Sequence, residues 1–139
     1  MKSIFEKLNL KAKREIVVIN APQSFEAELA ALAKRGVSVL RAPQRGAAIE
    51  FAIAFATQQN EVDALSETFA SKSEGDAIVW FAYPKGTSKR FTCDFNRDTG
   101  WDAMRRAGFD TVRQVAIDED WTALRFRRVE YIKASTRRS

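Results

Sequence analysis

Residues 77–83 read AIVWFAY, and these seven apolar residues are the segment on which the prediction of the fold rests. An unbroken apolar run rich in β-branched and aromatic side chains is typical of a strand that is buried on both faces. Strands of this kind lie in the middle of parallel sheets whose faces are covered by helices. The run therefore predicts the central strand of an α/β sheet.

Two further strand-like segments follow on the C-terminal side, TVRQVAI (111–117) and TALRFRRVEY (122–131). The few residues between them are too short for the crossover that two parallel strands require, so an antiparallel hairpin is predicted. A helix is predicted between the hairpin and the central strand, over NRDTGWDAMRRAG (96–108). The C-terminal third of the chain is thus expected to end the sheet with antiparallel strands.

Strand-like and helix-like segments alternate on the N-terminal side of the central run. Strands are predicted at EIVVIN (15–20), VSVL (37–40) and IEFAIAFA (49–56). Helices are predicted at APQSFEAELAALAKRG (21–36), with Ser24 as the N-cap, and at NEVDALSETFASK (60–72). This order predicts a three-layer α/β/α Rossmann-like sandwich, with a mostly parallel sheet that ends in an antiparallel C-terminal hairpin.

The length of 139 residues and the apolar fraction of 45% are ordinary values for one globular domain. A short helix is predicted over SIFEKLNL, where Ser3 and Glu6 have the spacing of a capping box. We therefore expect an N-terminal helical arm over residues 1–14, a single α/β domain over 15–131, and a basic C-terminal tail over 132–139.

Histidine is absent from the sequence, and Cys93 is the single cysteine. These counts exclude Ser-His-Asp and Cys-His catalysis in their usual form, and no metal site is expected. The nearby cations Lys89 and Arg90 would favour a thiolate at Cys93, but no histidine is present to assist it as a base. No apolar run is long enough to cross a bilayer, and the N-terminal segment does not read as a secretory signal. A cytoplasmic protein with no membrane partner is expected.

The net charge of +5 is concentrated near the C-terminus. The cations there are Arg125, Arg127, Arg128, Lys133, Arg137 and Arg138. A basic segment of this kind attracts nucleic acid or other anionic surfaces. The alternative is a solvated edge strand and tail, in which cations prevent pairing with another chain.

The segments GDAIVWFAYPKG and RRAGFDTVRQVAIDEDWTALRFRR, with a helix between them, resemble the last third of a class I methyltransferase fold over residues 75–131. The resemblance implies a Rossmann-like sheet that ends in an antiparallel hairpin, and none of the shared segments is catalytic. The whole chain also resembles a bacterial family of small proteins known only as a domain of unknown function, through VVINAP, YPKGTSK and AIDEDWTALRFRR.

Two departures from the methyltransferase pattern concern the cofactor. The resemblance implies a glycine-rich turn after the first strand and an acidic residue near the end of the second strand. This sequence has NAPQSF (20–25) at the first position and Arg41 at the second. S-adenosylmethionine is therefore disfavoured and no cofactor is expected. The signatures of a dinucleotide-binding turn and of a P-loop are absent as well.

Ligands of open α/β sheets bind beyond the carboxyl ends of the strands, and this rule selects the candidate site. Lysine, arginine, hydroxyl groups and backbone N–H groups near that edge suit a phosphate or a carboxylate. We expect the partner to be an anionic small molecule. The candidate ligand-binding residues are Asn20, Ser24, Arg41, Thr57, Tyr83, Lys85, Thr87, Ser88 and Lys89. The alternative is that Pro84 and Gly86 only shape a turn whose lysines are solvated.

Two other groups of residues have a functional and a structural interpretation. Asp118, Glu119 and Asp120 could supply a general base, or they could form the turn of the hairpin. The three tryptophans, Trp80, Trp101 and Trp121, are expected in the core or covering the sheet.

Three functions remain open at this stage. The first is a non-catalytic binding or regulatory module with an anion-favouring crevice. The second is a small-molecule enzyme, either a degenerate methyltransferase or one that acts on a phosphorylated or carboxylated substrate. The third is association with nucleic acid through the C-terminal arginines.

Overall fold

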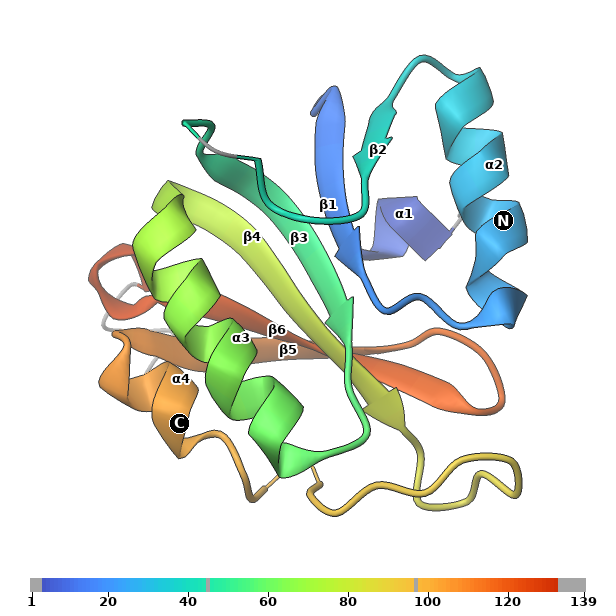
Figure 1. Cartoon of the computed structure of the whole chain (residues 1–139), viewed down its shortest axis with the longest axis vertical. Coiled ribbons are helices and arrows are strands. Elements are labelled where there is room, and N and C mark those ends of the chain that lie inside the picture. The colour runs from blue at the N-terminus through green and yellow to red at the C-terminus, as the bar shows by residue number, and fades with distance from the viewer. Residues whose placement is uncertain (1–3, 45, 97, 133–139) are drawn as a thin grey trace.

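The computed structural model describes residues 4–44, 46–96 and 98–132. Its centre is a six-stranded sheet with the strand order β2-β1-β3-β4-β6-β5 (Figure 1). The strands are β1 (Glu15–Ile19), β2 (Ser38–Leu40), β3 (Ile49–Phe55), β4 (Ser73–Pro84), β5 (Phe109–Ala116) and β6 (Trp121–Arg128).

The direction of the strands confirms the predicted fold class. Strands β2, β1, β3 and β4 are parallel to one another, whereas β6 is antiparallel to both β4 and β5. Strand β5 therefore runs in the same direction as β4. The chain is a Rossmann-like α/β protein with a mostly parallel sheet and an antiparallel C-terminal hairpin.

Helices cover the two faces of the sheet. Helix α1 (Ile4–Lys7) and helix α2 (Glu26–Lys34) pack on one face, and helix α3 (Gln59–Lys72) and helix α4 (Asp102–Arg106) pack on the other (Figure 1). A short 3₁₀ turn at Gln23–Phe25 precedes α2, and another at Val129–Tyr131 follows β6. Each face has its own apolar core, which is the three-layer arrangement that the alternating sequence pattern predicts.

Strand β3 shows how one strand serves both cores. The register against β4 shifts between Ile49 and Phe51, and Ile49 lies in the core under α3. From Phe51 onward, the large side chains Phe51, Ile53 and Phe55 belong to the core under α1 and α2, and Ala52 and Ala54 belong to the core under α3. Successive side chains of a strand point to opposite faces, so this division follows from the alternation in the sequence.

The N-terminal segment is packed into the first of these cores. Phe5, Leu8 and Leu10 are at most 4% exposed, and the indole Nε1 of Trp80 donates a hydrogen bond of 2.9 Å to the backbone carbonyl of Leu8. This bond joins the segment before β1 to the central strand. The division into an arm, a domain and a tail stays a prediction.

Three details differ from the sequence-based expectations. The helix predicted over 96–108 is only α4, because Gly100 adopts a φ of +95° that ends any helix reaching it from the N-terminal side. Ser24 does not cap α2: it lies inside the preceding 3₁₀ turn, and Phe25 occupies the N-cap position without a side-chain hydrogen bond. The capping box of Ser3 lies outside the described residues. The structure also places Val129–Tyr131 in a turn after β6 instead of in the strand.

The tryptophans are buried, as predicted. Trp80 and Trp101 are 0% exposed and Trp121 is 3% exposed. Trp101 packs against Phe81 and Phe126 with ring centroids 5.5 and 5.1 Å apart, and its Nε1 donates to the carbonyl of Asn96 at 2.9 Å. These rings form the centre of the core under α3 and α4.

The interpretation of the C-terminal arginines as an edge strand is wrong, because β6 lies between β4 and β5. Arg127 forms two hydrogen bonds with Asp76, of 2.8 and 2.6 Å. Arg128 donates to the backbone carbonyl of Ser73 at 2.8 Å and stacks over the ring of Phe109, 4.7 Å from its centroid. These two side chains therefore hold the sheet together. Lys133, Arg137 and Arg138 lie outside the described residues.

Candidate functional site

The carboxyl ends of the parallel strands meet at one edge of the sheet, so the loops that follow them can share a ligand. Asn20 is the first residue after β1, Arg41 is the first residue after β2, and Thr57 is the second residue after β3. The loop that begins at Lys85 follows β4, and the acidic turn at 118–120 follows β5. The structure divides these candidate residues among separate surroundings.

A cleft of about 700 Å³ opens at this edge beside the end of β4. Its walls come from β4, from the loops that follow β4 and precede α4, and from the hairpin. The residues that line it are Tyr83, Lys85, Gly86, Thr87, Asn96, Asp98, Gln114, Ala116 and Thr122. We call it the carboxyl-edge cleft. Its volume lies within the range of small-molecule sites.

Neutral polar side chains from three strands are linked inside the carboxyl-edge cleft. The amide Nε2 of Gln114 donates to the hydroxyl of Tyr83 at 3.3 Å and to Oγ1 of Thr122 at 3.2 Å. The hydroxyl of Thr122 donates in turn to the carbonyl of Val115 at 3.2 Å. Ordered hydroxyl and amide groups of this kind orient a polar ligand at little entropic cost.

The aromatic ring of Tyr83 lines the cleft. Tyr83 is 4% exposed, and its ring packs against Phe95 and Trp101 with both pairs of centroids 5.7 Å apart. Tyr83 therefore belongs to the core while its hydroxyl reaches the network above it. The cleft thus combines the ring of Tyr83 and the methyl group of Ala116 with several polar side chains.

Lys85 is the cation of this cleft. Its backbone N–H donates to the carbonyl of Asp120 at 2.8 Å, so the start of the loop is held against the hairpin. Among the described residues, its ammonium group forms no ion pair. The carboxylate of Asp98 lines the same cleft. Among the described residues that line the cleft, Lys85 is the one cation and Asp98 is the one carboxylate.

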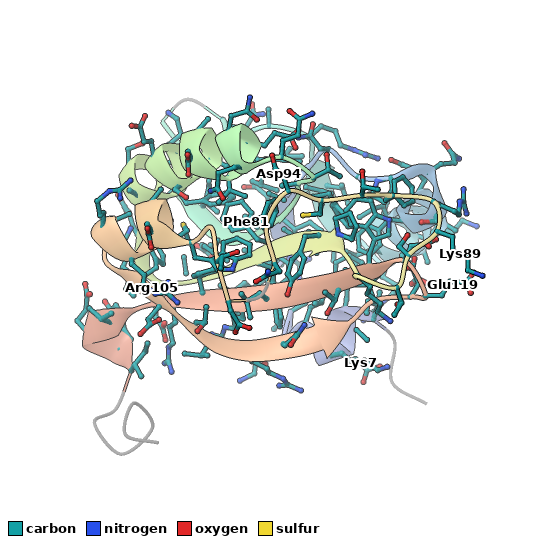
Figure 2. All side chains as sticks on the ribbon, turned by 90° about the horizontal axis from the view of Figure 1, so that it is seen from below. Lys7, Phe81, Lys89, Asp94, Arg105 and Glu119 are labelled. Carbon is teal, nitrogen blue, oxygen red and sulfur yellow. The ribbon has the colours of Figure 1, made fainter. Side chains whose placement is uncertain are left out.

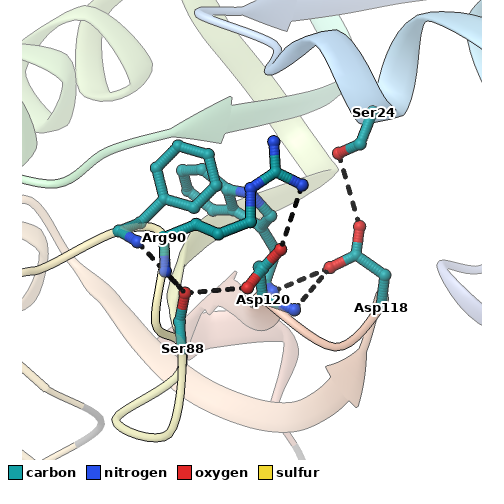
Figure 3. A network of polar contacts seen from close by, with 7 residues as sticks. Ser24, Ser88, Arg90, Asp118 and Asp120 are labelled. Carbon is teal, nitrogen blue, oxygen red and sulfur yellow. Dashed lines mark hydrogen bonds and ion pairs between the residues drawn. The ribbon is translucent and has the colours of Figure 1, made fainter.

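Ser88 has a structural role in the loop after β4 (Figure 3). Its hydroxyl donates to Oδ1 of Asp120 at 2.8 Å and accepts from the backbone N–H groups of Arg90 and Phe91 at 3.3 and 3.2 Å. Lys89 lines none of the clefts described here. Figure 2 shows it at one end of the molecule, with Arg105 at the other end.

The acidic turn of the hairpin also uses its carboxylates in structural contacts. Oδ1 of Asp118 accepts from the backbone N–H groups of Asp120 and Trp121 at 2.8 and 2.9 Å. Its Oδ2 accepts from the hydroxyl of Ser24 at 3.5 Å (Figure 3). Hydrogen bonds from a side chain to the backbone two and three residues on are typical of a turn, so the turn accounts for these aspartates.

Arg41 pairs with a carboxylate of its own chain. Its two terminal nitrogens donate to the two carboxylate oxygens of Glu26, both at 2.8 Å, and both side chains are more than one-third exposed. These hydrogen bonds lower the pKa of Glu26 and raise the pKa of Arg41. The guanidinium at the end of β2 is therefore already engaged by a carboxylate.

Replacing Arg41 with alanine is expected to raise the pKa of Glu26 toward its ordinary value of about 4.3, because the donors that favour the carboxylate are removed. Because the pKa of Glu26 is lower in the folded chain than in the unfolded chain, the pair stabilises the fold at pH values above the ordinary pKa. This contribution is lost as the pH falls through the lowered pKa of the folded chain. The stability difference between wild type and R41A should therefore shrink below about pH 4. Carboxyl-resolved NMR titration measures this pKa, and R35A, at the end of α2, is the control. An unchanged pKa of Glu26 in R41A would contradict the pairing.

The remaining candidates lie elsewhere along the edge. Asn20 has a left-handed backbone with a φ of +60° and turns the chain after β1. Thr57 lines a smaller hollow of about 330 Å³ together with Cys93 and Asp94. Burial is the main cause of a raised pKa at Cys93. The expectation that nearby cations would favour its thiolate is therefore wrong.

The structure thus brings together Tyr83, Lys85 and Thr87 in one cleft. Ser88 lies in the same loop, where its backbone N–H donates to the carbonyl of Lys85 at 3.0 Å, but it does not line the cleft. Asn20, Ser24 and Arg41 line none of the clefts described here. The cleft adds polar residues that the sequence analysis did not select: Asn96, Asp98, Gln114 and Thr122. The signal for two of them was present, because Gln114 and Thr122 interrupt the apolar positions of the hairpin. Their partner across the sheet was not visible in the sequence.

No group of three or more His, Cys, Asp or Glu side chains in residues 4–44, 46–96 and 98–132 is arranged to hold a metal ion. Within the same part of the chain, no helix is long and apolar enough to cross a bilayer.

Comparison with solved structures finds methyltransferases. A SAM-dependent methyltransferase from Aquifex aeolicus superposes with a TM-score of 0.62 at 10% identity, covering 90% of this chain and 87% of that one. The N-methyltransferase NodS from Bradyrhizobium japonicum WM9 gives 0.56 at 11% identity, covering 90% and 92%. A fibrillarin pre-rRNA processing protein from Methanococcus jannaschii gives 0.53 at 11% identity, covering 85% and 67%.

These likenesses establish a methyltransferase-like fold over almost the whole chain. Neither the known family models nor the curated proteins match the sequence. At about one identical residue in ten, the structural neighbours share the fold with this chain, and residue roles cannot be carried over from them.

Proposed function

We propose that the protein is a binding or regulatory module on a methyltransferase-like fold, and that it holds a small polar ligand with one anionic group in the carboxyl-edge cleft. The observation that carries the proposal is the cleft itself, which is lined both by the network of Gln114, Tyr83 and Thr122 and by Lys85, whose ammonium group forms no ion pair within residues 4–44, 46–96 and 98–132. The network offers hydroxyl and amide groups to the neutral part of the ligand. Lys85 offers a point charge to a phosphate or a carboxylate.

Two observations support a ligand other than S-adenosylmethionine. The turn after β1 carries no glycine, and Phe25 at its end is 2% exposed and packs on Phe55 with ring centroids 5.0 Å apart. The end of β2 presents a guanidinium paired with Glu26, where the methyltransferase pattern implies a carboxylate for the ribose hydroxyls. Both positions therefore favour a ligand without the ribose and methionine groups of that cofactor.

The alternative function is a small-molecule enzyme, and the fold is the observation that favours it. A structure of NodS in complex with S-adenosyl-L-homocysteine superposes with a TM-score of 0.56 at 10% identity and covers 90% of this chain. The resemblance of the sequence to a bacterial family of small proteins of unknown function remains a prediction. Thermal-shift measurement with S-adenosylmethionine and with phosphorylated and carboxylated small molecules separates the two functions. A shift with S-adenosylmethionine alone would favour the enzyme.

Replacing Lys85 with glutamine is expected to weaken the binding of a phosphorylated or carboxylated ligand by about tenfold or more, because a charge-assisted contact is lost. Saturation at about one hundred times Kd should stabilise the wild type by roughly 2.7 kcal/mol, and a tenfold weaker variant should keep only about 1.4 kcal/mol at the same concentration. The matched control is K89Q, which removes a lysine from the same loop outside the cleft. Equal affinities of K85Q and the wild type would rule out this role for Lys85.

A further inference from the structure

A second and larger cleft, of about 950 Å³, opens at the opposite edge of the sheet. The parallel strands begin at this edge, which is the upper one in Figure 1. Its walls are the segment 9–15 before and at the start of β1, the start of β3, and the facing parts of β4 and β6. We call it the amino-edge cleft. It shares no lining residue with the carboxyl-edge cleft.

Cations outnumber carboxylates around the amino-edge cleft. Five of its lining residues are cationic, namely Lys11, Lys13, Arg14, Arg125 and Arg127, and three are acidic, namely Glu15, Glu50 and Asp76. Arg127 already occupies both oxygens of Asp76, and Lys13 lies 3.9 Å from Glu50. Among the described residues, no ion pair joins Lys11, Arg14 or Arg125 to a carboxylate.

Arg125 is a half-buried cation of the amino-edge cleft. It is opposite Arg113 on β5 and near Arg127 on its own strand. Burial is the largest cause of its lowered pKa, Arg127 and Arg113 lower the pKa further, and Asp76 offsets part of this effect. Its Nε is buried and has no hydrogen-bond partner among the described residues. Like charges held close together at a half-buried position are unfavourable unless an anion compensates them. A bound anion would supply that compensation.

The lysines of the N-terminal segment are held in place by the backbone. Asn9 and Lys11 have left-handed φ values of 67° and 55°, and Leu10 N donates to Phe5 O at 3.1 Å. Leu10 is buried, and β1 begins at Glu15. The cations at 11, 13 and 14 are therefore placed between two fixed points. Such an arrangement lowers the entropic cost of binding.

We propose that the amino-edge cleft binds a small molecule that carries two or more phosphate groups. Its volume suits a ligand of nucleotide size or smaller. Several cations arranged around one hollow can contact several phosphates, and arginine can donate two hydrogen bonds to each. The residues that line the cleft include no exposed aromatic ring on which the bases of a single strand could stack, which favours a small ligand over nucleic acid.

Isothermal titration calorimetry with inorganic tripolyphosphate at constant ionic strength tests the proposal. The wild type is expected to bind it, and the double variant K13Q/R125Q is expected to raise Kd by about tenfold or more. R106Q removes an exposed cation from α4 on the other face of the sheet and should keep Kd within about twofold. K89Q, in the loop after β4 and outside both clefts, should also leave this affinity unchanged.

NMR of the wild type keeps the test independent of how the variants fold. Tripolyphosphate is expected to shift the backbone amide signals of residues 9–15, 48–51 and 76–78. The absence of binding, or shifts confined to 83–87 and 114–122, would overturn the proposal. A single-stranded oligonucleotide that binds more tightly than tripolyphosphate and loses affinity in K13Q/R125Q would also overturn it, because the cleft would then serve nucleic acid.

Discussion

Replacement of Trp80 with alanine is expected to lower the free energy of unfolding by about 3–5 kcal/mol, a large part of the stability of a domain of this size. Trp80 is 0% exposed in the central strand and packs in the core that includes Phe5, Leu8 and Phe51. The change removes a whole indole ring and leaves a cavity that the surrounding strands can only partly fill. Urea unfolding followed by circular dichroism measures the loss.

The variant W80F separates the hydrogen bond of Trp80 from its volume. The phenyl ring fills most of the space but cannot donate to the carbonyl of Leu8, so W80F should lose less stability than W80A. The variant should also increase proteolysis or amide exchange in the segment before β1, because the bond that joins this segment to the sheet is gone. A loss in W80A below about 1 kcal/mol would contradict the packing described here.

Replacement of Gly100 with alanine is expected to lower the free energy of unfolding by about 2–4 kcal/mol. The φ of Gly100 is +95°, which residues with a side chain rarely adopt. A methyl group at this position would overlap Oε1 of Gln59 and lie 2.8 Å from Cβ of Phe95. Gln59 donates to the carbonyl of Gly100 at 2.7 Å, so the contact between α3 and this loop would be lost as well.

Gly108 provides the matched control for this substitution. Its φ is also +95°, but a methyl group there would meet no atom within 4 Å. G108A should therefore show the conformational strain alone, about 1 kcal/mol, and the difference between the two variants measures the overlap at Gly100. Equal losses in G100A and G108A would show that the loop adapts without cost. Because the loop before Gly100 carries Asn96 and Asp98, G100A is also expected to weaken binding at the carboxyl-edge cleft.

The general architecture follows from local patterns in the sequence. Apolar runs such as 77–83 and the alternation in 49–56 predict strands, because side-chain direction in a strand repeats every two residues. The short connection between 111–117 and 122–131 predicts a hairpin, because a parallel crossover needs a longer segment. The helix over 96–108 was overestimated, since the sequence does not show the backbone angle at Gly100.

The clefts and the partners of the polar side chains depend on the tertiary structure. Tyr83 meets Gln114 from 31 residues away, and Ser24 meets Asp118 from 94 residues away. Arg41 was expected to face a ligand, but it donates hydrogen bonds to Glu26, which is 15 residues away in the sequence. Periodicity and turn chemistry act between neighbours in the chain, so they predict which elements form. The partner of a polar side chain depends on which distant segment lies beside it, and that choice is made by the packing of the whole sheet.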